Sequence, residues 1–212
     1  MLENGRGKFL KGSFYSFGAL ALGYGGLEMA QVSVEEVEIK ARENRYGERL
    51  VPDMAEAAEL VAKKALVEVI KPLGRVRYNY SKEFSIYPLT ERVMDDFNQH
   101  WYLKGLRDWR SVAGGSVRLA VPGFGGIYLA ENKLHLPVEW KRALTARPGI
   151  AYLSGPLEDF IGIVGHEMGH YFGWKGAHTS NPDSPAGTAA SVVHYFRTGE
   201  VKALVPENPM KR

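Results

Sequence analysis

The chain has 212 residues, of which 45% are hydrophobic, and a formal net charge of +3. This length and hydrophobic content suit one globular domain, with or without an N-terminal extension. The charge is only mildly basic, and no run of Lys or Arg is interleaved with aromatic residues, so we expect no nucleic-acid partner. The absence of cysteine excludes disulfides and thiolate metal ligands, but it does not decide the compartment.

Residues 1–50 differ from the rest of the chain and are expected to form an N-terminal extension to a main domain over residues 51–212. Three basic residues precede an uncharged run over residues 12–27. This order resembles a secretory signal, although the run is short and contains five glycines. Two interpretations stay open. The run is a targeting or membrane-associating segment of a secreted or membrane-associated protein, or it belongs to an extension that packs or binds a partner.

The first long helix of the main domain is expected to begin at Pro52 and Asp53, with Asp53 as its N-cap, and to end before Pro72. Apolar residues at helical spacing predict its buried face, which comprises Ala58, Val61, Ala62, Ala65, Leu66 and Val69. Alternating residues over 75–80 predict a strand. A second helix is expected from about Thr90, with a buried side formed by Val93, Met94, Phe97 and Trp101.

Strands are predicted at residues 116–121 and 126–130, and residues 133–136 are expected to pair back after a turn. Another long helix should begin near Pro156 and end at Gly173, where glycine enters the left-handed conformation cheaply. An irregular tail would follow. This order of elements indicates an α+β domain with helices against a mixed sheet.

The helix expected before Gly173 carries the segment His166-Glu167-Met168-Gly169-His170. Residues four apart share one face of a helix, so His166 and His170 can bind one metal ion. Glu167 can reach a metal-bound water without being a ligand, which suits a general base. The spacing is the H-E-x-x-H signature of zinc hydrolases. The alternative is a pair of solvent-facing histidines on an amphipathic helix.

Catalytic zinc takes three protein ligands and a water, so a further ligand is required. His178, which follows Gly173 in sequence, is one candidate. His194, Asp183 and Glu200 stay open as alternatives.

Residues 166–173, HEMGHYFG, resemble the first eight positions of the metzincin zinc-peptidase motif, H-E-x-x-H-x-x-G-x-x-H. The position of the third histidine holds Gly176, and His178 lies two residues later. The resemblance implies a zincin-like α+β fold, with a mixed twisted sheet, an active-site helix and a backing helix. It also implies Zn²⁺ held by His166, His170 and His178.

Two further segments resemble parts of the same family. Residues 191–195, SVVHY, resemble the Met-turn with Val193 in place of the methionine, which implies that Tyr195 steadies the transition state. Residues 125–129 resemble the edge strand that pairs with substrate, which implies that Ile127, Tyr128 and Leu129 bind substrate.

The resemblance as a whole implies a zinc-dependent endopeptidase, in which Glu167 activates a zinc-bound water against a protein or peptide substrate. Three alternatives accompany it. The substrate could be the peptide cross-links of a cell wall, or the chain could be a structural or assembly protein that retains zinc for stability. In the third, residues 1–50 form an autoinhibitory pro-region.

Overall fold

A computed structural model describes residues 33–76, 82–99, 115–118, 126–149, 153–173 and 181–205, all within one compact unit, Gln31–Arg212. The apolar run at residues 12–27 and the expected zinc ligand His178 lie outside the described residues. The same is true of Trp101 and of the side chain of Phe97.

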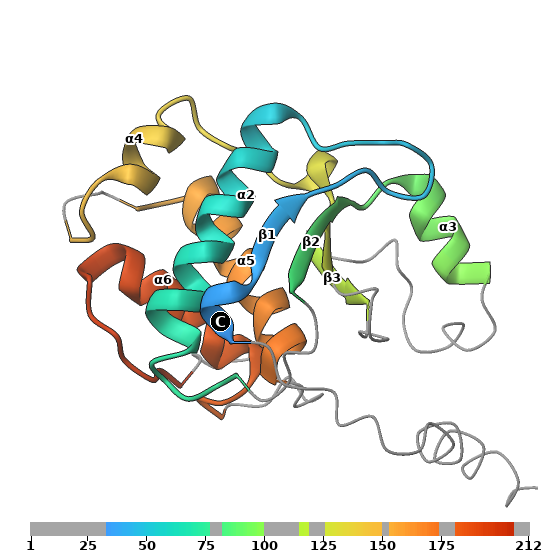
Figure 1. Cartoon of the computed structure of the whole chain (residues 1–212). Helices are drawn as coiled ribbons and strands as arrows, with labels where there is room; N and C mark the ends of the chain where they lie inside the picture. The colour runs from blue at the N-terminus through green and yellow to red at the C-terminus, as the bar shows by residue number, and fades with distance from the viewer. Residues whose placement is uncertain are drawn as a thin grey trace, which may run out of the picture. The chain divides into compact units, whose positions relative to one another are not determined.

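Among the described residues the sheet has four strands in the order β1-β2-β4-β3. Figure 1 labels β1, β2 and β3 of this sheet. Strands β1 (Glu38–Ala41), β2 (Glu83–Pro88) and β4 (Gly126–Leu129) run parallel, and β3 (Gly115–Arg118) pairs antiparallel with β4. The expectation of an α+β unit with a mixed sheet is therefore confirmed.

Strands β2 and β4 are the inner strands of the sheet. Successive side chains of a strand point to opposite faces, so each of these strands contributes to both faces of the sheet. Phe84 and Ile86 of β2, with Ile127 and Leu129 of β4, are fully buried in the main core beneath the helices. On the other face the rings of Tyr87 and Tyr128 stack with centroids 5.1 Å apart.

Helix α2 (Pro52–Lys64) continues without interruption into the π-helical segment η2 (Ala65–Ile70). Its N-cap is Val51 and not the expected Asp53, because Pro52 already occupies the first helical position. The expected buried face is confirmed, and its residues are all 0 or 1% exposed: Ala58, Val61, Ala62, Ala65, Leu66 and Val69. This face packs against the sheet and against helix α5.

Helix α3 (Glu91–Gln99) begins where the sequence predicts it, since the Thr90 hydroxyl accepts a hydrogen bond from the Val93 amide at 3.4 Å. Val93 and Met94 are buried as expected. They form a small second cluster with Leu89 and Ala130 on the face of the sheet that carries Tyr128.

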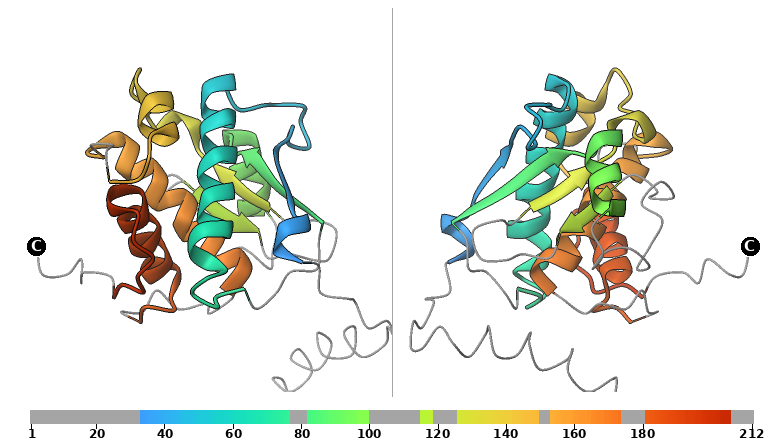
Figure 2. Two further views of the ribbon diagram at one scale, coloured as in Figure 1. Left: turned by 60° about the vertical axis from the view of Figure 1, so that its left-hand side comes forward. Right: turned by 90° about the vertical axis from the view of Figure 1, so that its right-hand side faces the viewer.

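After β4 the described elements are helical, and the α-helices are α4 (Trp140–Thr145), α5 (Pro156–Gly173) and α6 (Pro185–Thr198). Helices α2, α5 and α6 lie together on one side of the sheet (Figure 2). Single 3₁₀ turns occur at η1 (Val34–Glu36) and η4 (Glu131–Lys133). None of the helices in the described part of the chain is both long and apolar enough to cross a membrane.

Strand β1 precedes residue 51 and pairs with β2. The strand predicted over residues 75–80 lies mostly outside the described residues, and the next described strand is β2 at Glu83–Pro88. Two expectations are corrected. The stretch 133–136 forms no strand, and the expected irregular tail contains α6, which the Ser184 side chain caps.

Candidate metal centre

Helix α5 owes its position to five large apolar residues on its buried side. Phe160, Ile161, Val164, Met168 and Phe172 are all fully buried. The helix begins at Pro156, with two acidic residues in its first turn near the positive end of the helix dipole.

The C-terminal half of α5 is held against strand β2 by aromatic contacts. The Tyr171 ring meets the Phe84 ring edge-on with centroids 4.7 Å apart, and the Phe172 ring stacks on Phe84 at 5.6 Å. Burial raises the pKa of the Tyr171 hydroxyl, with a smaller contribution from Tyr87. These contacts fix the rotation of the helix and therefore the direction in which its other side chains project.

The two histidines lie on the half-buried face of α5, away from these aromatic contacts. Their rings are edge to face, with centroids 4.9 Å apart and planes inclined by 77°. Glu167, between them in sequence, is only 7% exposed. Imidazole nitrogens are zinc ligands, and a nearby carboxylate that is not a ligand suits proton transfer, so this donor set fits two ligands and the base of a zinc site.

The described residues place no third ligand beside the histidine pair. Within those residues no three His, Cys, Asp or Glu side chains are placed to hold a metal ion, so neither Asp183, His194 nor Glu200 completes the histidine pair. His194 instead has its Nε2 atom 3.6 Å from the Glu200 carboxylate at the far end of α6. His178 stays a prediction because it lies outside the described residues.

The segment that resembles a Met-turn is not a turn. Residues 191–195 lie inside α6, which runs antiparallel to α5, since Gly162 faces Val193 and Gly169 faces Thr188. Tyr195 is therefore level with the N-terminal half of α5, whereas the histidines are in the C-terminal half. Burial and the Glu68 carboxylate of η2 raise the pKa of Tyr195. The structure does not bring Tyr195 to the histidine pair.

The expected substrate-binding strand is an inner strand. Strand β4, which contains Ile127, Tyr128 and Leu129, is paired on both sides, to β2 and to β3. Its backbone groups are therefore used within the sheet, and the expectation of an open edge at residues 127–129 is wrong. Among the described strands the edge on this side is β3, which runs antiparallel and contacts α5.

A groove of about 540 Å³ follows the N-terminal half of α5. Its walls include Gly162 and Ile163 of the helix, Val193 of α6 and the exposed His135. Gly162 and Ile163 precede His166 by about one helical turn, so the groove lies beside the turn of α5 that comes before the histidine pair, and neither histidine lines it.

Glycines on α5 allow α6 to approach closely, a feature that the sequence interpretation missed. A Cβ atom at Gly165 would lie 3.0 Å from the Val192 Cβ, and one at Gly169 would lie 2.9 Å from the Thr188 Cβ. The spacing of Gly162, Gly165 and Gly169 on one helical face was the available signal. Gly173 ends α5 as expected. It does not adopt the left-handed conformation, which occurs at other described glycines such as Gly155 and Gly199.

No protein-family model, curated protein or solved structure matches this chain.

Proposed function

We propose that this protein is a zinc-dependent peptidase whose active site is built on α5. The observation that carries the proposal is the pairing of His166 and His170 on one half-buried face, with the buried Glu167 beside them. Two imidazoles and one carboxylate in this order match the needs of a hydrolytic zinc site. The third ligand is proposed to be His178.

Bound zinc would polarise a substrate carbonyl and lower the pKa of a coordinated water to about 7. The histidines would hold the ion, and the aromatic contacts of Tyr171 and Phe172 with Phe84 would keep the helix that carries them in place. Glu167 would accept the proton of the attacking water and deliver it to the leaving amine. Its burial reduces competition from bulk water for this proton.

The substrate would be an extended peptide. Strand β3 supports this proposal, because it is an antiparallel edge strand in contact with α5, and a peptide can add to such an edge by main-chain hydrogen bonds. The groove beside Gly162 and Ile163 offers room for substrate side chains along the same helix.

The decisive experiment compares Glu167→Gln with the parent protein on unstructured protein substrates. The variant should bind zinc as the parent does and lose peptidase activity by about 100-fold or more, because only the base is removed. Glu56→Gln is the matched control, since it removes an exposed carboxylate of α2 that pairs with Lys141 at 2.8 Å. Equal cleavage by the parent and Glu167→Gln would overturn the proposal.

The same protein samples test the alternatives. Cleavage of cell-wall peptide cross-links without cleavage of casein would move the substrate to the cell wall. Stoichiometric zinc with four protein ligands and no activity on either material would indicate a structural site. Self-cleavage within the first 50 residues on addition of zinc would indicate a pro-region.

A further inference from the structure

The stretch between η4 and α4 is an extended segment without a pairing partner. Leu134 has the backbone angles of a strand, with φ of −108° and ψ of 140°. Within the described part of the chain no backbone hydrogen bond involves His135 or Leu136, and the His135 side chain is exposed. The N–H and C=O groups of these two residues are therefore available to a second extended chain, as they are at the open edge of a sheet.

Two grooves meet at this segment. One is the groove of about 540 Å³ beside the N-terminal half of α5, and the other, of about 420 Å³, includes the start of α2 and the start of α4 in its walls. Leu134 and His135 line both grooves, so the two adjoin at these residues. Side chains of a strand alternate between its two sides, so an extended chain paired with the segment can place side chains in both grooves.

The groove at the start of α2 has a mainly apolar lining. Met54 and Trp140, both 3% exposed, form part of its wall together with Leu134. Val51 and Val138 also line it, and they are 48 and 94% exposed. Covering such exposed apolar groups is favourable, so this groove suits an apolar side chain of a bound molecule.

The charges of the two grooves favour a basic partner. Their described lining residues include four carboxylates and one lysine: Asp53, Glu131, Glu158, Asp159 and Lys133. This excess of negative charge contrasts with the net charge of +3 of the whole chain. Glu158 pairs with Arg197, whereas the exposed carboxylate of Asp159 has no partner among the described residues. A lysine or arginine side chain of a bound peptide would complement Asp159.

The larger groove lies close to the proposed catalytic centre along α5. Gly162 is in its wall, and His166 follows four residues later, which is about 6 Å along the helix axis. An extended peptide advances about 3.3 Å per residue. A side chain held beside Gly162 would therefore belong to a residue about two positions from a peptide bond at the histidine pair.

We propose that residues 134–136 and the two grooves beside them bind an extended peptide with basic and apolar side chains. The peptide main chain pairs with the backbone groups of His135 and Leu136. An apolar side chain covers Val138, and a basic side chain meets Asp159. The proposal rests on the proposed function in one respect, because that function makes the bound peptide the substrate. Binding itself needs no zinc.

Binding is measured by fluorescence polarisation with the full-length Glu167→Gln protein, which should leave the probe uncut. The probe is a dye-labelled octapeptide of lysine and leucine with glycine at each end. It should bind at least about tenfold more tightly than the same peptide with glutamate in place of lysine. A general response to the positive net charge of the chain would favour the glutamate peptide instead. Equal binding of the two peptides, or tighter binding of the glutamate peptide, would overturn the inference.

Asp159→Lys, made in the same protein, tests the contact with the basic side chain. It should weaken binding of the lysine peptide about fivefold or more, because a like charge replaces the complementary one. Glu91→Lys is the matched control. Glu91 is also an exposed carboxylate in the first turn of a helix, it lines neither groove, and its replacement changes the net charge equally. Glu91→Lys should keep the affinity, and equal losses in the two variants would overturn the inference.

Two further measurements test the apolar groove and the main-chain pairing. Val138→Ser should weaken binding about threefold, whereas Val205→Ser, which alters an exposed valine outside both grooves, should not. A probe methylated at its backbone nitrogens cannot donate main-chain hydrogen bonds and should bind about fivefold less tightly. Unchanged binding of the methylated probe, or equal binding by Val138→Ser and Val205→Ser, would overturn the inference.

The outcomes separate this inference from the proposed function. If the probe binds with the expected dependence on Asp159 and Val138 but the parent cleaves no peptide, the proposed function fails and the binding site stands. If the parent cleaves peptides and the Glu167→Gln protein does not bind the probe, only the inference fails.

Discussion

A Cβ atom on Gly169 would stand 2.9 Å from the Cβ of Thr188 and equally close to the Cα of Pro185. Real Cβ atoms do not approach other carbons this closely, so α6 can lie against α5 here only because residue 169 has no side chain. The contact is one residue from the zinc ligand proposed at His170. The separation of the two helices and the position of the candidate metal centre are therefore linked.

Gly169→Ala should destabilise the protein by about 1–3 kcal/mol, because overpacking outweighs the gain in helix propensity. Gly162→Ala is the matched control, since its Cβ would lie at an ordinary 3.6 Å from Val193 Cγ2. That variant should gain about 0.5–1 kcal/mol from the loss of backbone freedom in the unfolded chain. Urea unfolding of both variants measures the difference, and equal stability of the two would contradict the packing described.

Phe84→Ala should lower the free energy of unfolding by about 3–5 kcal/mol. Phe84 is fully buried, and its ring contacts both Tyr171 and Phe172 at the end of α5. Val138→Ala is the surface control, because Val138 is 94% exposed, and it should change stability by less than about 0.5 kcal/mol. A thermal or urea midpoint for Phe84→Ala close to that of Val138→Ala would show that the aromatic contacts do not hold α5.

The sequence predicted the helices in which buried apolar residues recur at regular spacing. The apolar residues of α2 and α5 recur at helical spacing, so their buried faces could be assigned without knowledge of their partners. Thr90 could be recognised as a helix cap because capping is a contact within one turn. The positions of His166 and His170 on one face follow from the same helical geometry.

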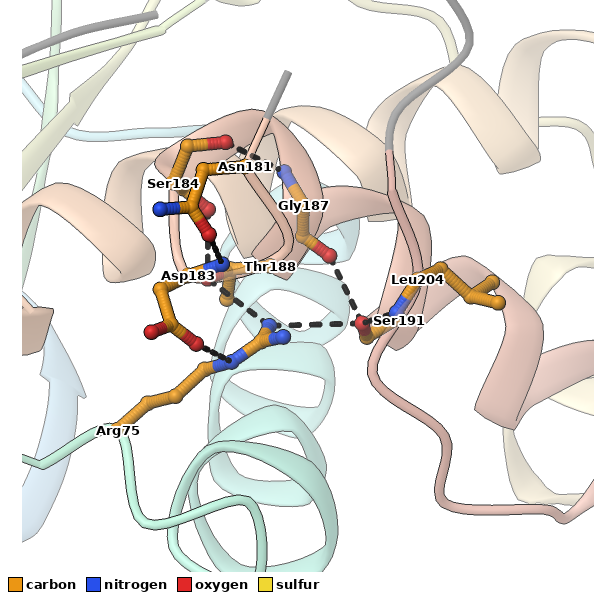
Figure 3. Close-up of polar contacts among 8 residues, drawn as sticks. All are labelled: Arg75, Asn181, Asp183, Ser184, Gly187, Thr188, Ser191 and Leu204. Atoms are coloured by element: carbon orange, nitrogen blue, oxygen red, sulfur yellow. Dashed lines mark hydrogen bonds and ion pairs between the residues drawn. The ribbon is translucent and has the colours of Figure 1, made fainter. Parts of the chain in front are cut away.

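Features that depend on distant residues could not be predicted in this way. Strand order is set by pairing between separate segments, so the sequence could not place β3 outside β4. The letters of residues 191–195 suggested a turn, but the Ser184 cap, Pro185 and the contact with α5 select a helix. The buried Arg75 could not be recognised from the sequence either, because its hydrogen-bond partners Thr188 and Ser191 are more than a hundred positions away (Figure 3).

Zinc should stabilise the metal-free protein if α5 carries the proposed site. A ligand that binds only the folded state at 100 times its Kd adds about 2.7 kcal/mol, which raises the melting temperature. His170→Ala should abolish this rise because it removes one ligand. His135→Ala is the matched control, since His135 is an exposed histidine outside the pair, and it should keep the rise. A rise of parental size in His170→Ala would rule out His170 as a ligand.

The last prediction concerns acid stability and Glu48. The Glu48 carboxylate accepts from the Thr90 hydroxyl at 2.6 Å and from the Asn44 side-chain amide at 2.8 Å. These hydrogen bonds, that of Thr90 first, lower the pKa of Glu48 below its ordinary value of 4.5. A carboxylate with a lowered folded pKa contributes stability that is fully present above its unfolded pKa. That stability is lost as the pH falls from about 4.5 through the lower folded value.

Glu48→Gln should therefore reduce the difference in urea midpoint between pH 7 and about pH 3, because glutamine does not titrate. Glu139→Gln serves for comparison, since the exposed Glu139 makes no side-chain cap hydrogen bond at the start of α4, and it should keep the parental difference. Thr90→Ala should act in the same direction as Glu48→Gln, because it removes the hydrogen bond that contributes most to the lowered pKa. A parental pH dependence in both Glu48→Gln and Thr90→Ala would mean that this carboxylate does not link acid stability to the start of α3.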